Sequence, residues 1–234
     1  MKVGVIQSSF IPWRGYFDFI ASVDAFVFLE DVQYTSCGWR NRNKIKTPKG
    51  TEWVTIPVMR GGKDLLIRDA KIDCSQGWIK RLQGSWTTNY GRSEFFNETV
   101  ELLAEIETTR YENLSSLNIE LTKRICDYLS ITTPLIDSSD LSLEGTKTDR
   151  LIDLLKKLNA TSYLSGPSAD VYLDKEAFRR NGIRLEYKSY DYEPYPQLWG
   201  PFEGTVMVLD LIANCGPDAK NHIRSRTPDK VIIE

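Results

Sequence analysis

Two short apolar runs open the sequence, at residues 2–7 and 25–29. Each has the length of a buried strand, and the continuous apolar character of the second is typical of a central parallel strand. Between them, Pro12 breaks the chain, and apolar residues from Tyr16 to Ala21 recur at helical spacing. A strand, a short helix and a second strand predict a βαβ unit with a right-handed crossover.

In the middle of the chain, the spacing of the apolar residues changes from that of strands to that of helices. Residues 75–130 carry apolar stripes at helical spacing and predict a helical insert or cap. Before it, the turn residues 47–50 predict a hairpin between 45–46 and 53–58. After it, the pattern predicts strands at 134–137, 162–164 and 183–187 and helices at 149–158, 175–181 and 205–213.

Together these elements predict an α/β fold with a parallel-rich central sheet flanked by helices, a helical insert or cap and a small β-hairpin. We divide the 234 residues into an N-terminal α/β half with the hairpin (1–74), the helical insert (75–132) and a C-terminal α/β half that completes the sheet (133–234).

Composition excludes several classes of protein. The formal net charge of −2 gives no global reason to expect nucleic acid. No run approaches the ~20 apolar residues of a membrane span, and the N-terminus lacks a signal-peptide pattern, so we expect a cytoplasmic protein. Four scattered cysteines and one histidine, His222, predict no metal site, disulfide or histidine-based catalytic triad.

Polar residues follow the first two predicted strands. Gln7 leaves the first, and Asp31 and Gln33 leave the second. Ligands of open parallel sheets bind beyond the carboxyl ends of strands, so we predict that these three side chains face one crevice and are catalytic. The alternative is that Asp31 caps a turn and Gln33 is solvated.

A second candidate is the run Arg40-Asn41-Arg42-Asn43-Lys44, in which we single out Asn41, Arg42 and Asn43 as substrate-binding residues. Arginine matches phosphate or carboxylate bidentately, and asparagine is depleted in strands, so the run indicates an anion or sugar site rather than a solvated charge run. Trp13 has the shape to stack on a base or sugar, although core packing explains it equally well.

Two later segments carry weaker signals. Ser165-Gly166 follows a strand and offers backbone N–H groups to an anion, although a structural turn is the simpler explanation. Tyr195 and Gln197 lie in a proline-fixed loop with groups suited to ligand binding. Asp210 lies inside an apolar helix and needs a partner, for which we expect an arginine in a structural salt bridge, with a catalytic arrangement as the alternative.

Taken together, these segments resemble the WbqC-like family. The resemblance rests on Gln7, Pro12-Trp13-x-Gly15-Tyr16-Phe17, Asp24, Asp31-Val32-Gln33, Asn41-Arg42-Asn43, Ser165-Gly166, Tyr195-Pro196-Gln197 and Asp210-Leu211-x-x-Asn214-Cys215-Gly216. It adds Tyr16 to the predicted substrate-binding residues, and Tyr192 stands where the family often has a histidine. The resemblance implies a role in bacterial surface-polysaccharide (O-antigen) biosynthesis.

In that setting the residues favour a transferase that moves an acyl or aminoacyl group onto the amine of a nucleotide-linked amino sugar. Such a reaction needs a base and oxyanion donors, so we assign Asp31 as base, Gln33 and Asn41 as donors and Arg42 as anion clamp. We expect no tightly bound cofactor, with acyl-CoA or ATP as co-substrate. The alternatives are an ATP-dependent ligase or nucleotidyl transferase, and a non-catalytic sugar-nucleotide-binding module.

Overall fold

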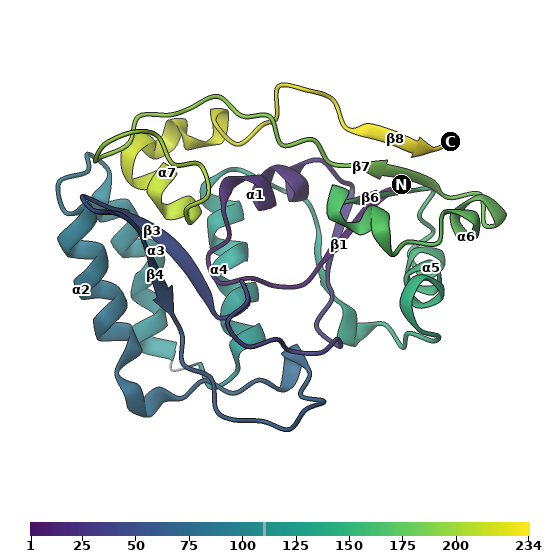
Figure 1. The fold of residues 1–234 in the computed structure, drawn as a ribbon, viewed down its shortest axis with the longest axis horizontal. Coiled ribbons are helices and arrows are strands. Elements are labelled where there is room, and N and C mark those ends of the chain that lie inside the picture. Colours follow the sequence, from purple (N-terminus) through teal and green to yellow (C-terminus); the bar gives the residue numbers. More distant parts are fainter. Residues whose placement is uncertain (110) are drawn as a thin grey trace.

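A six-stranded sheet organises the computed structural model, which describes residues 1–109 and 111–234 (Figure 1). Its strand order is β5-β2-β1-β6-β7-β8. The first five strands in that order run parallel, and β8 pairs antiparallel with β7. The strands are β1 (Lys2–Ile6), β2 (Ala25–Phe28), β5 (Leu135–Asp137), β6 (Ser162–Ser165), β7 (Arg184–Tyr187) and β8 (Lys230–Ile233). The predicted parallel-rich α/β fold is confirmed.

The direction in which strands are added reverses between β1 and β6. From β1 the chain builds outward to β2 and β5, and then returns to place β6 on the other side of β1. Loops leaving the carboxyl ends of two such strands diverge, because one turns to each face of the sheet, and a crevice opens between them. The fold therefore places a crevice beside the ends of β1 and β6.

Helices cover both faces of the sheet. One face packs Phe26 and Phe28 against α1 (Arg14–Ala21), and the other packs Val5 and Val27 against α5 (Lys147–Lys157) and α6 (Lys175–Arg180). Gly4 lies on the α1 face, where an added Cβ would stand 2.4 Å from a ring carbon of Phe19. Close packing of α1 on β1 therefore requires glycine there.

The predicted helical middle region is confirmed as α2 (Trp78–Tyr90), α3 (Phe96–Thr109) and α4 (Leu114–Tyr128). These helices lie together with α7 (Val208–Cys215) and the hairpin in one half of the molecule (Figure 1). Their buried apolar side chains join those of α1 and β2 in one cluster. The middle of the chain thus shares its core with the sheet.

The separate hairpin pairs β3 (Arg42–Thr47) with β4 (Gly50–Thr55). Its turn falls at residues 47–50 as predicted, but β3 begins three residues earlier than expected. Asn43 tolerates the strand because its amide donates to the carbonyls of Phe10 and Ile11, at 3.1 and 2.7 Å.

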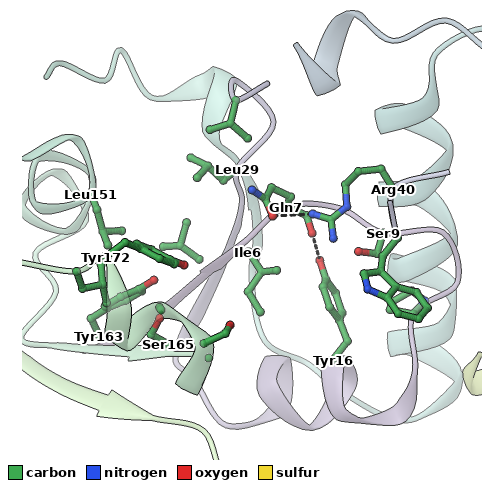
Figure 2. Close-up of a pocket in the computed structure, with 18 of the residues that line it drawn as sticks. Ile6, Gln7, Ser9, Tyr16, Leu29, Arg40, Leu151, Tyr163, Ser165 and Tyr172 are labelled. Atoms are coloured by element: carbon green, nitrogen blue, oxygen red, sulfur yellow. Dashed lines mark hydrogen bonds between the residues drawn. The ribbon is translucent and has the colours of Figure 1, made fainter. Parts of the chain in front are cut away.

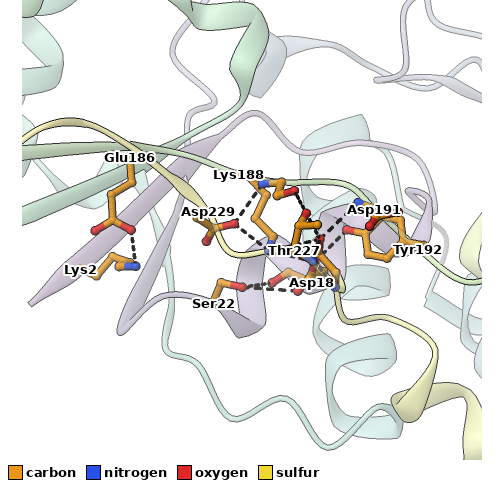
Figure 3. A network of polar contacts seen from close by, with 11 residues as sticks. Lys2, Asp18, Ser22, Glu186, Lys188, Asp191, Tyr192, Thr227 and Asp229 are labelled. Atoms are coloured by element: carbon orange, nitrogen blue, oxygen red, sulfur yellow. Dashed lines mark hydrogen bonds and ion pairs between the residues drawn. The ribbon is translucent and has the colours of Figure 1, made fainter.

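Strand β8 was not predicted, and its segment is held by a buried ion cluster (Figure 3). Lys188, just after β7, lies 2.9 Å from the carboxylate of Asp18 on α1 and 3.1 Å from that of Asp229, next to β8. Ser225 N–H and the Tyr192 hydroxyl also donate to Asp18. These contacts tie the C-terminal segment to α1 and β7. None of the helices in the described residues is long and apolar enough to cross a membrane.

Candidate functional site

A cleft of about 1180 Å³ opens at the switch between β1 and β6 (Figure 2). Its walls come from the ends of β1, β2 and β6, the start of α5 and the segment that includes Trp39 and Arg40. The residues that line it include Gln7, Trp13, Tyr16, Arg40, Asn43, Lys147, Arg150, Tyr163, Ser165, Gly166 and Tyr172.

The β1 wall is held by two hydrogen bonds. The Tyr16 hydroxyl donates to the backbone carbonyl of Gln7 at 3.0 Å, and Arg40 Nη1 donates to Gln7 Oε1 at 2.6 Å. With Oε1 engaged, the amide of Gln7 is oriented with its N–H₂ group available as a donor. Figure 2 shows the Arg40 guanidinium directed toward Gln7 and Tyr16. Burial raises the pKa of Tyr16 well above its usual value, so its hydroxyl stays protonated.

The opposite wall comes from the end of β6 and from α5. Ser165 and Gly166 leave β6 and lead into the 3₁₀ helix Pro167–Val171. Arg150 on α5 donates to the carbonyl of Leu143 and forms an ion pair with Asp31. Tyr172, which is 69% exposed, lies at the rim. This wall therefore offers an aromatic ring beside basic side chains.

The charged side chains that line the cleft in the described part of the chain are basic. Arg40, Lys147 and Arg150 line the cleft, and no Asp or Glu does so among the described residues. Much of the remaining lining is apolar, such as Ile6, Leu29 and Leu151. An apolar cleft with a few convergent basic groups suits an organic anion.

Six of the residues predicted from the sequence lie together in this cleft: Gln7, Trp13, Tyr16, Asn43, Ser165 and Gly166. They come from β1, the start of α1, β3 and the end of β6. Gln7 and Ser165 lie at strand exits as predicted, but the strand whose exit faces that of β1 across the cleft is β6, which pairs with β1 on the side opposite β2.

The structure does not bring Asp31, Gln33, Asn41 or Arg42 into the lining. Asp31 is engaged by Arg150 and Ser138, and Gln33 is exposed and donates to the carbonyl of Lys63. Asn41 is buried and donates to the carbonyl of Ile56. Arg42 lies over the ring of Trp53, 4.0 Å from its centroid.

Tyr195 and Gln197 also lie outside the cleft, in a buried cluster around Asp210. Asp210 accepts hydrogen bonds from the hydroxyls of Tyr90 and Tyr195 and from Gln197 Nε2, at 2.7, 2.8 and 2.7 Å. The expected arginine partner is therefore wrong, because hydroxyl and amide donors satisfy the carboxylate. Burial nevertheless raises the pKa of Asp210.

Sequence reasoning missed Lys147, Arg150 and Tyr172, and it included Arg40 in the candidate run without assigning it a binding role. Arg150 lies in the predicted helix 149–158, and Lys147 lies two residues before the start that was predicted for it. The start of α5 could have been placed at the cleft, because a helix that precedes a parallel strand such as β6 starts at the carboxyl edge of the sheet. No group of three or more His, Cys, Asp or Glu in the described part of the chain is placed to hold a metal ion.

An open sheet with helices on both faces and a basic cleft at its switch point defines a doubly wound α/β protein. The WbqC-like protein family matches residues 7–222, and the chain belongs to that family. Over 226 residues it is 44% identical to "Uncharacterized protein Rv1507c" of Mycobacterium tuberculosis (strain ATCC 25618 / H37Rv), covering 95% of this chain and 97% of that protein. No solved structure matches the chain. The resemblance noted from the sequence is confirmed.

Proposed function

We propose that this protein acts in surface-polysaccharide biosynthesis by binding a nucleotide-linked amino sugar in the cleft and transferring an acyl or aminoacyl group to its amine. Membership of the WbqC-like family supports the setting. The observation that carries the proposal is the cleft itself, which lies at the switch point and is lined by three basic side chains and no acidic one among the described residues.

The proposed reaction needs few protein groups. The amine attacks the acyl carbon of an activated donor such as acyl-CoA, an N–C bond forms, the C–S bond breaks, and the leaving thiolate takes up the proton that the amine loses. The carbonyl oxygen becomes negative on the way, and fixed N–H donors stabilise it. Gln7 N–H₂, which is oriented by the bond from Arg40 to Gln7 Oε1, is the donor we assign to that oxygen.

Asp31 has a different role here from the base assigned above. Its side chain is only 7% exposed and is paired with Arg150. We therefore propose that Asp31 positions Arg150 on the cleft wall, and that Arg150 and Lys147 attract the anionic part of the substrate.

A second candidate is a non-catalytic module that binds nucleotide-linked sugars. The specific observation in its favour is that no carboxylate from the described residues lines the cleft, so the lining offers no general base of the usual kind. This candidate predicts binding without turnover.

Mass spectrometry separates the candidates. The protein is incubated with UDP-, GDP- or dTDP-linked amino sugars plus acyl-CoA, and separately with ATP plus an amino acid. An N-acylated sugar nucleotide supports the transferase, and a product formed only with ATP supports a ligase. A raised melting temperature without any product supports the binding module. No product and no thermal shift with any sugar nucleotide contradicts the proposal.

A matched pair of glutamine variants sharpens that experiment. Gln7→Ala removes the proposed oxyanion donor and should lower kcat/KM by roughly 100-fold. Gln33→Ala removes an exposed glutamine outside the cleft and should leave kcat/KM within about twofold of the wild type. Equal losses in both variants would remove Gln7 from the mechanism.

A further inference from the structure

Arg40 is a half-buried cation in the cleft wall that pairs with none of the described carboxylates. Among the described residues, its guanidinium donates from Nη1 to Gln7 Oε1, which is a neutral acceptor. Its Nε is buried without a hydrogen-bond partner there, as are those of Arg14 and Arg42. The buried carboxylate of Glu30 acts on Arg40 electrostatically, but it accepts hydrogen bonds from Ser8 and Ser115.

Three other cations of low exposure have an anion or an aromatic ring as a partner. Lys188, 4% exposed, has carboxylates of Asp18 and Asp229 within 3.1 Å. Arg14 donates to two backbone carbonyls and lies over the rings of Tyr192 and Tyr195, and Arg42 lies over Trp53. The buried ammonium of Lys46 resembles Arg40, because it donates to a neutral amide oxygen, Gln197 Oε1, at 2.9 Å. Of these five cations, Arg40 and Lys46 have no ion pair and no aromatic ring among the described residues, and of the two only Arg40 lines the cleft.

Partial burial of an unpaired charge is costly, because water is removed and nothing replaces it. Burial accordingly lowers the pKa of Arg40. Such a group does not stabilise the free protein. A ligand that supplies a negative charge would offset the cost of its burial. Because Arg40 lines the cleft, the ligand is reached from the cleft.

We propose that Arg40 is the phosphate-anchoring residue of the cleft, binding a non-bridging oxygen of a diphosphate while Gln7 fixes the guanidinium plane. Identification of that diphosphate with the one in a nucleotide-linked sugar rests on the function proposed above. The planar guanidinium fork matches a phosphoryl group, and the exposed Lys147 in the same lining adds further positive charge for a diphosphate.

The Arg40 side chain can be replaced without removing the contacts that hold its backbone. The carbonyl of Arg40 accepts from Asn118 Nδ2 at 2.8 Å, and the carbonyl of Trp39 accepts from Phe10 N–H at 3.0 Å. Arg40→Met keeps a long apolar stem and deletes the charge. Since the charge is uncompensated in the free protein, we expect the melting temperature of Arg40→Met without ligand to equal or exceed that of the wild type.

Calorimetric titration of inorganic pyrophosphate into the full chain tests the proposal. The wild type should bind, Arg40→Met should bind at least 10-fold more weakly, and Arg42→Met should bind like the wild type, because Arg42 lies outside the cleft. Arg40→Lys, which keeps the charge but not the fork, should fall between wild type and Arg40→Met, and it remains informative if Arg40→Met does not fold. Affinity of Arg40→Lys and Arg40→Met within twofold of the wild type, or no binding by the wild type, overturns the proposal.

Parallel titrations with UDP-, GDP- and dTDP-linked amino sugars keep the two proposals distinct. Pyrophosphate binding that depends on Arg40, without binding of any sugar nucleotide, supports the phosphate anchor and contradicts the proposed function. Sugar-nucleotide binding that is insensitive to Arg40→Met supports the proposed function and overturns the phosphate anchor.

Discussion

Two polar regions of this molecule use the same kinds of side chain to different ends. In the cluster around Lys188, the ammonium group has two carboxylates, and Asp18 accepts further bonds from Tyr192 and Ser225 (Figure 3). In the cleft wall, the partner of the Arg40 guanidinium among the described residues is the neutral oxygen of Gln7 (Figure 2). In the first region each charged group has charged or hydrogen-bonding partners within the protein, and in the second a cation lacks an anionic partner among the described residues.

The difference separates polar groups that hold the fold from polar groups that meet a ligand. A structural cluster must satisfy each buried charge in the free protein, because folding alone has to offset desolvation. In a binding site, the ligand can supply the partner that a buried charge lacks in the free protein. Structural clusters and binding sites therefore differ in whether their charged groups have partners within the protein, even where they contain the same residue types.

The largest effect should come from breaking the closed cluster. Lys188→Met leaves Asp18 and Asp229 buried without their cation, and should lower the free energy of unfolding by about 3–5 kcal/mol. Urea denaturation at neutral pH measures it. Arg179→Met, which breaks an exposed pair with Glu176, is the control and should cost no more than about 0.5 kcal/mol. Similar values for the two variants would contradict the structural role of the cluster.

Loss of a hydrogen-bond acceptor at Asp210 should lower the free energy of unfolding. Asp210→Asn replaces one acceptor oxygen with a donor while Tyr90, Tyr195 and Gln197 still need acceptors, and should cost about 1–3 kcal/mol. The same denaturation experiment checks it, with the exposed Asp218→Asn as the matched control. If sugar-nucleotide affinity fell while stability did not, Asp210 would belong to the binding site instead.

Glu30 is a buried carboxylate that accepts hydrogen bonds from Ser8 and Ser115. Burial raises its pKa above the usual value of 4.5, although hydrogen bonds from Ser115 and Ser8 oppose the shift. The folded state therefore holds the proton more tightly than the unfolded state, and the contribution of Glu30 to stability declines as pH rises from about 4.5 through its folded pKa.

Glu30→Gln removes that titration and keeps the shape of the side chain. The free energy of unfolding of the wild type, minus that of the variant, should decrease between pH 4.5 and pH 7. Denaturation at several pH values in that window measures the difference. An increase with pH would mean that the folded pKa is depressed instead, and the sign of the argument would be reversed.

The smallest effect should come from Arg42, which sits next to the cleft segment but outside the lining. A double-mutant cycle of Arg42→Met and Trp53→Ala should give a coupling of about 0.5–1 kcal/mol in stability, from the cation–π contact. Neither variant should change sugar-nucleotide affinity. A loss of affinity in Arg42→Met without one in Trp53→Ala would restore Arg42 as an anion clamp.

Sequence patterns predicted the fold class and six of the residues that line the cleft. Apolar runs and helical stripes are local signals, so β1, β2, the middle helices and the exits at Gln7 and Ser165 followed from them. Which strands neighbour one another is not local: β6 joins β1 across more than half the chain, and that pairing sets the position of the crevice.

Several side chains have roles that local sequence patterns do not reveal, because their partners lie far away in the sequence. Asp31 resembles a free carboxylate at a strand exit until Arg150, 119 residues later, is seen to engage it. Asn41 and Asn43 resemble ligand-binding amides, yet their N–H₂ groups hold backbone carbonyls of neighbouring segments. Short edge strand β8 depends on its pairing with β7 and on the anchoring of its segment by Lys188.

A crystal structure of the protein with a bound UDP-linked amino sugar tests the central claim most directly. We predict that the diphosphate lies in the cleft between β1 and β6, with a phosphate oxygen on the Arg40 guanidinium and the sugar against Gln7. Ordered ligand on any other surface, with the cleft empty and Arg40 untouched, would contradict the account.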